Sequence, residues 1–312
     1  MSRRLIYVSL SVVVVMWGGA FVAIKILLRH ASAPTIALFR FSLTTAGLVL
    51  ITAFLRPPRR PIAGPDRKKI VLMGLCGVSG YHLSLNFGER FVSANVAALI
   101  VMSMPVMVAI MSRFLLGEVV NAAKVGGIVL ALAGVVVLVL WSSAGGELSV
   151  RSVGGAAVTA LAPLSWAIYT VTSKPLVAKY HPLYLSTLAL SLGTLMLTPF
   201  AIVPAIHDVA GLTLSDWGWL LVLGLGGTAF AYAIWFYALE KLDASRVAAW
   251  VYFVPITALL WAGILLGEDV TPFIAVGGAM VFAGVVLIER VAPRRAAAEA
   301  EDKNLVAAGE PF

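Results

Sequence analysis

A shift of 150 residues aligns ANVAALIVMSMPVMVAIMSRFLLGE at residues 94–118 with ASRVAAWVYFVPITALLWAGILLGE at residues 244–268, without a gap. The distinctive residues coincide in register: Pro105 on Pro255, Gly117 on Gly267 and Glu118 on Glu268. A shared apolar bias would not align Pro, Gly and Glu together. The chain is therefore expected to consist of two related halves.

The match continues on both sides of these stretches. The same shift places Gly127, Ala133 and Gly134 on Gly277, Ala283 and Gly284, and a shift of 149 places Trp17 on Trp166 and Lys25 on Lys174. We expect a first repeat at 1–141, a linker at 142–152 and a second repeat at 153–290. The tail at 291–312 is rich in Ala and charged residues, which predicts a disordered cytoplasmic segment.

The composition identifies a membrane protein. Of the 312 residues, 61% are hydrophobic and 12% are charged, whereas soluble domains average about 45–50% and about 25%. The mean hydropathy of +0.98 also indicates a membrane protein. These values exclude a soluble enzyme or a nucleic-acid-binding protein. The lone Cys76 cannot form a disulfide within the chain, and no Cys/His cluster indicates a metal site.

Apolar stretches long enough to cross a bilayer recur along the whole chain. An all-α fold follows, because helices satisfy their own backbone polar groups in lipid. The ten expected spans are 5–28, 34–55, 70–88, 92–116, 122–141, 153–174, 182–204, 215–239, 244–267 and 270–290. The first span lacks a convincing signal-peptide cleavage site and is interpreted as an uncleaved helix.

The positive charges orient these spans. With a cytoplasmic N-terminus, 18 of the 23 Lys and Arg residues lie inside, three lie outside and two, Lys25 and Arg40, fall within helices. Cytoplasmic loops carry the excess of Lys and Arg, so both termini are expected in the cytoplasm. This bias also explains the net charge of +8 without nucleic acid.

Five helices per half is an odd number, so the second half begins on the opposite side of the membrane. The halves are then an inverted pair related by an axis in the membrane plane. Carriers use this arrangement because the two halves can rock about a site near the midplane.

Several short motifs occur in a characteristic order: Trp17-Gly18-Gly19 with Lys25, the prolines 105 and 255, and LLGE at 115–118 and 265–268. With the five-plus-five helices, they make residues 1–290 similar to the EamA type of the drug/metabolite transporter superfamily. The resemblance implies a carrier of amino acids, other metabolites or drugs. Tyr81, His82 and Trp166 fall where exporters of aromatic and other neutral amino acids would have their cavity. Such a carrier would lie in the bacterial inner membrane.

His82 is the only one of four histidines placed deep in an expected span. If that helix begins near Ile70, His82 lies about 18 Å along it, near the bilayer centre. An ionisable residue at this depth is a functional candidate; the alternative is a neutral His that only bonds a neighbouring helix. Tyr81 and Asn86 share the polar stretch, so all three are predicted to bind substrate.

Aromatic residues supply the other candidates. Trp17 and Trp166 lie mid-span, and a buried indole N–H needs a partner, which favours a cavity wall. Tyr169 follows Trp166 by about one helical turn, and Trp250 and Tyr252 are also deep. All five are predicted substrate-binding residues, with apolar packing as the alternative.

The repeated Pro, Glu and Gly residues have simpler interpretations. Pro105 and Pro255 should kink their helices and are candidate hinges. Glu118 and Glu268 either cap the next helix or act as gate charges. Lys25 and Arg40 either extend to the interface or attract a substrate carboxylate. The glycine-rich stretches at 126–134 and 277–284 suit close helix packing.

We therefore expect a secondary carrier and not an enzyme, exporting aromatic and other neutral amino acids through a central cavity without a cofactor. A multidrug or other metabolite carrier is the main alternative; a channel or a membrane-embedded enzyme is a third. The partners are a small-molecule substrate and the lipid bilayer, and the oligomeric state stays open, a monomer included. Because every acid lies at a helix end or in a loop, we expect facilitated diffusion, with proton uptake by His82 as the alternative.

Overall fold

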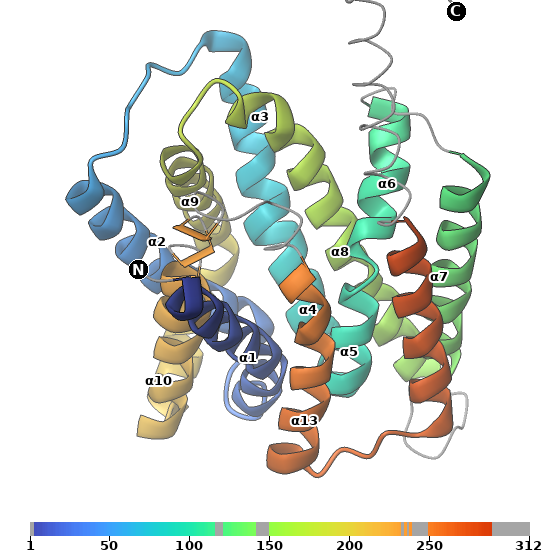
Figure 1. Cartoon of the computed structure of the whole chain (residues 1–312). Coiled ribbons are helices and arrows are strands. Elements are labelled where there is room, and N and C mark those ends of the chain that lie inside the picture. Colours follow the sequence, from blue (N-terminus) through green and yellow to red (C-terminus); the bar gives the residue numbers. More distant parts are fainter. Residues whose placement is uncertain are drawn as a thin grey trace, which may run out of the picture.

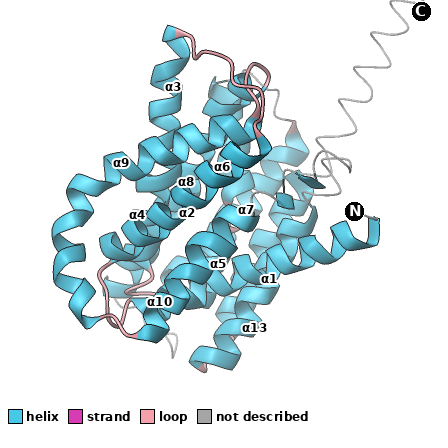
Figure 2. Cartoon of the chain, turned by 90° about the vertical axis from the view of Figure 1, so that its left-hand side faces the viewer, coloured by secondary structure: helices cyan, strands magenta, loops and turns pink. Residues whose placement is uncertain are grey.

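All secondary structure in the described part of the chain is helical, with no strand among those residues (Figures 1 and 2). The computed structural model describes residues 3–115, 121–141, 150–231, 234–235, 237–238 and 249–288. The all-α prediction is thus confirmed for these ranges. The predicted tail at 291–312 and most of the predicted linker lie outside them.

The elements follow the expected spans. In chain order they are α1 (Arg3–Leu27), α2 (Ala33–Leu55), α3 (Gly64–Gly74), a π-helical segment (Leu75–Gly80), α4 (Tyr81–Gly88), α5 (Ala94–Val101), α6 (Met104–Leu115) and α7 (Ala122–Leu140). There follow α8 (Val150–Val177), α9 (Pro182–Asp208), a 3₁₀ turn (Val209–Gly211), α10 (Leu214–Leu221), a second π-helical segment (Val222–Phe230), a 3₁₀ segment (Ala249–Phe253), α13 (Val254–Leu266) and a last helix over Pro272–Ile288.

Six of these helical stretches are long and apolar enough to cross a bilayer, and three shorter apolar helices accompany them in the described residues. The third stretch begins at Gly64, six residues before the predicted start at Ile70. The prediction was wrong there because the polar turn Asp66 to Lys69 continues the helix beyond its apolar part. Large apolar side chains such as Phe54 and Phe200 are exposed on the outside, as expected of a surface that faces lipid.

Local sequence signals account for several helix ends. Ser93 begins α5 by accepting a hydrogen bond from the Val96 N–H, and Asn121 begins α7 in the same way. Thr213 and Asp216 form a reciprocal capping box at the start of α10. Gly267 ends α13 with a φ of 66°, a left-handed conformation that glycine adopts without steric cost.

Glycines let two pairs of helices approach closely. A Cβ on Gly127 of α7 would lie 2.7 Å from the Gly284 carbonyl oxygen of the last helix, and a Cβ on Gly134 would lie 2.7 Å from that of Gly277. Figure 1 shows α7 beside the last helix, drawn in red. A Cβ on Gly74 of α3 would likewise lie 2.7 Å from the Ala189 carbonyl oxygen of α9. These contacts confirm the packing role predicted for the glycines of α7 and the last helix.

Candidate functional site

A cavity of about 320 Å³ lies between the helices of both halves. Its described lining comes from α1, α2, both π-helical segments, α4, the α5–α6 junction, α8, α9 and the 3₁₀–α13 junction. α7 and the last helix contribute no residue to this described lining. α7 and the last helix, which are packed by paired glycines, therefore lie apart from the cavity.

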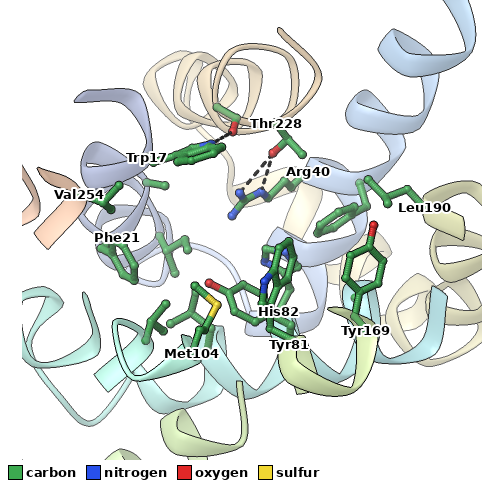
Figure 3. Close-up of a pocket in the computed structure, with 18 of the residues that line it drawn as sticks. Trp17, Phe21, Arg40, Tyr81, His82, Met104, Tyr169, Leu190, Thr228 and Val254 are labelled. Atoms are coloured by element: carbon green, nitrogen blue, oxygen red, sulfur yellow. Dashed lines mark hydrogen bonds between the residues drawn. The ribbon is translucent and has the colours of Figure 1, made fainter. Parts of the chain in front are cut away.

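Aromatic rings cover much of the cavity wall (Figure 3). The ring centroid of Tyr81 lies 5.5 Å from that of Trp166, and Trp166 lies 5.0 Å from Tyr169. The ring centroid of His82 lies 4.5 Å from that of Tyr81 and 4.4 Å from that of Phe41. Four residues predicted from sequence are thus brought together on one wall. Such rings offer apolar contact and π faces to a ligand.

Trp17 is the fifth predicted residue at the cavity. Its indole N–H donates a 2.9 Å hydrogen bond to the carbonyl oxygen of Gly227, in the second π-helical segment. Its ring lies 5.2 Å from that of Trp235, another lining residue. The expectation that a deep indole finds a polar partner is met here by backbone.

Both π-helical segments expose small residues to the cavity. Gly77 from the first and Gly227 with Thr228 from the second belong to the lining. A Cβ on Gly77 would lie 2.7 Å from the Tyr169 ring, so only glycine allows Tyr169 its position. π-helical turns occur frequently at functional sites.

Arg40 is the only Lys, Arg, Asp or Glu among the described residues that line the cavity. It is 7% exposed, and its Nε and Nη2 donate to the Thr228 hydroxyl at 3.3 and 3.2 Å. The Thr228 hydroxyl in turn donates to the Leu223 carbonyl oxygen at 2.9 Å. The sequence left open whether Arg40 extends to the interface or attracts a substrate carboxylate, and Arg40 was not among the predicted substrate-binding residues. Its position within an apolar span was the available signal.

His82 lines the cavity and is 6% exposed. Its Nδ1 is buried and has no hydrogen-bond partner among the described residues. Which nitrogen holds the proton is therefore not set by a protein partner at Nδ1.

The other predicted site residues lie elsewhere. Asn86 is buried and donates to the Ala33 carbonyl oxygen at 3.2 Å, and it is not in the lining. Trp250 stacks on Tyr7 at 6.3 Å, also outside the lining. The side chain of Tyr252 lies outside the described residues. Asn86 and Trp250 therefore do not line the cavity in this structure, and their role in substrate binding stays a prediction.

Both candidate hinge prolines stand at the start of a helical segment. Pro105 is the second residue of α6, directly after the break at Met102 and Ser103, and Pro255 is the second residue of α13, after the 3₁₀ segment. The missing proline N–H is not needed in the first turn of a helix. The helix axis is thus interrupted just before each proline, at residues that line the cavity or adjoin them.

A charged cluster lies where α1, α4, α5 and α13 end or begin. Lys25 Nζ donates to the carbonyl oxygens of Glu89 and Val92. Glu89 is 0% exposed, and neither of its carboxylate oxygens has a hydrogen-bond partner among the described residues. Burial raises the pKa of the Glu89 carboxyl well above its ordinary value, although the Lys25 ammonium opposes that rise. Glu89 thus lies at the end of α4, as the sequence indicated, but it is fully buried.

Glu268 belongs to the same region and has a structural role. Its two carboxylate oxygens accept hydrogen bonds from the N–H groups of Ala94 and Asn95, at 2.9 and 3.0 Å. These are first-turn donors of α5, which lack intrahelical partners. Glu268 therefore caps a helix of the other half, and not the next helix as expected. Glu118 lies outside the described residues.

A protein-family model matches nearly the whole sequence. The model of the EamA-like transporter family matches residues 4–140 and 153–290. The chain belongs to the EamA-like transporter family. It is a multi-pass membrane transporter, and its homologues are named as transporters.

Two relatives cover nearly the whole EamA chain. An "uncharacterized transporter" of Archaeoglobus fulgidus is 34% identical over 91% of this chain and 98% of that protein. A "probable terminal-alkyne amino-acid exporter" of Streptantibioticus cattleyicolor is 33% identical over 90% of this chain and 92% of that protein. A solved crystal structure matches 94% of this chain and 99% of its own, with a TM-score of 0.60 at 20% identity. That likeness supports the fold alone.

Proposed function

We propose that this protein is a secondary carrier that exports aromatic and other neutral amino acids through the central cavity. The observation that carries the proposal is the pairing of an aromatic wall, formed by Tyr81, Trp166 and Tyr169, with the cation Arg40. An amino acid with a large side chain offers an apolar group and a carboxylate to match them. The relative named as an amino-acid exporter gives further support.

In carriers built from repeats, alternating access arises when two related halves rock against each other. The glycine contacts support the presence of two such halves in this chain. A shift of 150 residues aligns Gly127 with Gly277 and Gly134 with Gly284. The Gly127–Gly284 contact therefore maps onto the Gly134–Gly277 contact. This crossed pairing is expected for two antiparallel helices related by a two-fold axis. It supports an inverted pair of five-helix repeats, at 1–141 and 153–290, with ten spans in all.

The π-helical segments repeat in the same way. The shift places Leu75–Gly80 on residues 225–230, inside the second segment Val222–Phe230. Each repeat thus has a widened turn at the cavity in its third helix. With the helix breaks before Pro105 and Pro255, these segments are the proposed places where the halves bend as they rock.

The inverted arrangement predicts a topology that labelling can test. Both termini should be cytoplasmic in the bacterial inner membrane. Cysteine introduced at Arg29 should react with a membrane-impermeant thiol reagent from outside, and cysteine at Arg60 should not, in a Cys76→Ser background. Labelling at position 60 with none at position 29 would overturn the topology.

Transport by purified protein in liposomes tests the function. The screen should include aromatic and small neutral amino acids, nucleosides and cationic drugs. Saturable, stereoselective uptake of aromatic amino acids supports the proposal. Preference for cationic drugs would favour the multidrug alternative, and single-channel currents would favour a channel. Arg40 in the cavity, with no carboxylate among its described lining residues, argues against cationic substrates.

We favour facilitated diffusion down the substrate gradient. His82 is the titratable imidazole at the cavity, and its charged form is disfavoured by apolar surroundings. Counterflow in liposomes with an imposed pH gradient provides the test. Concentrative uptake that collapses with a protonophore and is lost in His82→Gln would establish proton coupling instead.

A further inference from the structure

A buried acid at the start of α3 binds the other proposed repeat. Asp66, the third residue of α3, is 3% exposed. Its Oδ2 accepts hydrogen bonds from the Tyr180 hydroxyl at 3.0 Å and from Lys179 Nζ at 3.1 Å. Both partners lie in the connection between α8 and α9, and the Tyr180 hydroxyl also accepts the N–H of Ala63, which precedes α3. This contact, the first clasp, joins the first repeat to the second.

The 150-residue shift maps the first clasp onto a second contact. It places Asp66 on Asp216 and His30 on Tyr180. Asp216 is the third residue of α10 and is 1% exposed. Its Oδ2 lies 3.0 Å from Nδ1 of His30, which belongs to the connection between α1 and α2. This contact, the second clasp, therefore joins the second repeat to the first through equivalent positions.

The two clasps lie at opposite ends of the bundle. α2 and α9 are equivalent helices and run antiparallel, because Thr35 near the start of α2 bonds Asp208 at the end of α9, and Thr52 bonds Thr187. The second clasp lies just before the start of α2 and the first just before the start of α9, so the length of this helix pair separates them. Figure 1 shows the beginning of α3 at the top and α10 at the lower left.

Each clasped helix also packs closely on the α2–α9 pair, up to its π-helical segment. A Cβ on Gly74, the last residue of α3, would lie 2.7 Å from the Ala189 carbonyl oxygen of α9. A Cβ on the equivalent Gly224 would lie 2.8 Å from a carbonyl oxygen of α2. The widened turns Leu75–Gly80 and their counterpart at 225–230 follow these glycines directly. The close backbone contact therefore ends where the wider turns begin.

We infer that the two clasps hold α2, α9, α3 and α10 together as one fixed unit, while the segments beyond the π-helical turns move during transport. A carrier closes one face when it opens the other. Two equivalent contacts at opposite faces would therefore form in turn if they were gates. In this structure both are formed at once. Breaking either would also take hydrogen bonds from a buried carboxylate, which is unfavourable.

The fixed unit changes which parts of the molecule rock against each other. It combines helices of both repeats, so the boundary of motion runs through each repeat and not between the two. On the first repeat the moving part begins with α4, which carries Tyr81 and His82 of the cavity wall. This inference rests on the proposed function, because it concerns the motion of an inverted-repeat carrier.

Removal of a clasp tests the inference, because a contact that is present in every state stabilises all states equally. Asp66→Asn and Asp216→Asn each weaken hydrogen bonds to a buried charged group and should lower the apparent Tm in detergent by about 3–12 °C. Asp269→Asn changes an exposed acid and is the matched control, which should keep the wild-type Tm. The balance between outward-open and inward-open states should not change in any of the three variants. Apparent Tm values equal to that of the control would contradict a holding role.

Cysteine labelling measures the balance between the two states. Met104 lines the cavity, and Met104→Cys in a Cys76→Ser background offers one thiol there. An impermeant thiol reagent would be added to cells, from outside, and to inverted membrane vesicles, from inside. The ratio of the two labelling rates should be the same with and without each clasp. If a clasp existed in one state only, its loss would change that ratio about 10- to 100-fold, and such a change would overturn the inference.

Milder variants and the absence of a substrate keep the test decisive. If an Asn variant does not fold, Tyr180→Phe removes only the hydroxyl of the first clasp and His30→Gln removes the imidazole of the second, and the same labelling ratio is compared. Labelling requires no substrate. If wild-type vesicles transport no amino acid, the proposed function fails, and the labelling ratio still decides whether the clasps are fixed.

Discussion

Substitution of Gly127 by Ala should destabilise the protein by forcing α7 away from the last helix. The added Cβ would lie 2.7 Å from the Gly284 carbonyl oxygen and 2.8 Å from Ile288 Cγ1. A side chain can move aside, but the carbonyl oxygen belongs to the backbone, so the helices must separate. Overpacking of this kind costs about 1–3 kcal/mol. Ala also favours a helix over Gly by about 1 kcal/mol, which masks part of that cost.

The neighbouring Gly126 is a matched control. It is exposed, and a Cβ there would meet only Leu287 Cδ2, at 4.0 Å. Gly126→Ala gains the same helix propensity without the clash, so the difference between the variants isolates the packing cost. At about 2–4 °C per kcal/mol, the cost of about 1–3 kcal/mol should make Gly127→Ala unfold about 2–12 °C below Gly126→Ala in detergent. Equal apparent Tm values would refute the contact and with it the evidence for the crossed glycine pairs.

Three other perturbations probe the cap, the cavity and the buried acid. Glu268→Gln removes one of two charge-assisted hydrogen bonds to the start of α5 and should lower the stability of the fold by about 1.5–3 kcal/mol. The control Asp269→Asn changes an exposed neighbour and should have almost no effect. Equal apparent Tm values for the two variants would contradict the capping role of Glu268. Trp166→Ala should weaken transport of phenylalanine about 2- to 10-fold, because an aromatic contact contributes about 0.5–1.5 kcal/mol, and should affect alanine less; equal loss for both in a folded variant would indicate packing alone. Burial raises the pKa of Glu89 well above its ordinary value, so the folded protein keeps that proton where the unfolded chain has lost it. The stability of the fold should therefore fall as the pH rises above the ordinary pKa of a glutamate. Glu89→Gln should flatten this dependence, and an unchanged slope in thermal melts would assign it to another group.

The sequence predicted the helical spans well, but it predicted the positions of polar side chains within the bundle less well. Hydropathy placed most helix ends within a few residues, because a span is defined by its own composition. The prediction that Trp17, Trp166 and Tyr169 lie at a cavity agrees with the lining. Asn86 was predicted at the same site, but its amide bonds the backbone of Ala33 instead.

Spacing along a helix gives depth in the membrane but not the direction in which a side chain points. Asn86 lies one turn from His82, and only His82 reaches the cavity. That outcome depends on α2, whose Ala33 lies 53 residues away in the chain. The sequence offers no local signal for it.

By itself, the sequence determined the membrane class and most of the described helical spans, and it predicted two related repeats, because hydropathy and repeated residues are properties of segments. The tertiary structure decided which helix lies beside which. It placed Glu268 on the start of α5, 174 residues away, and set Arg40 of α2 against Thr228, 188 residues away. It also buried Glu89, which the sequence placed only at a helix end. The environment of a polar group in a bundle is set by neighbours from distant helices, so the site existed only once the helices were packed.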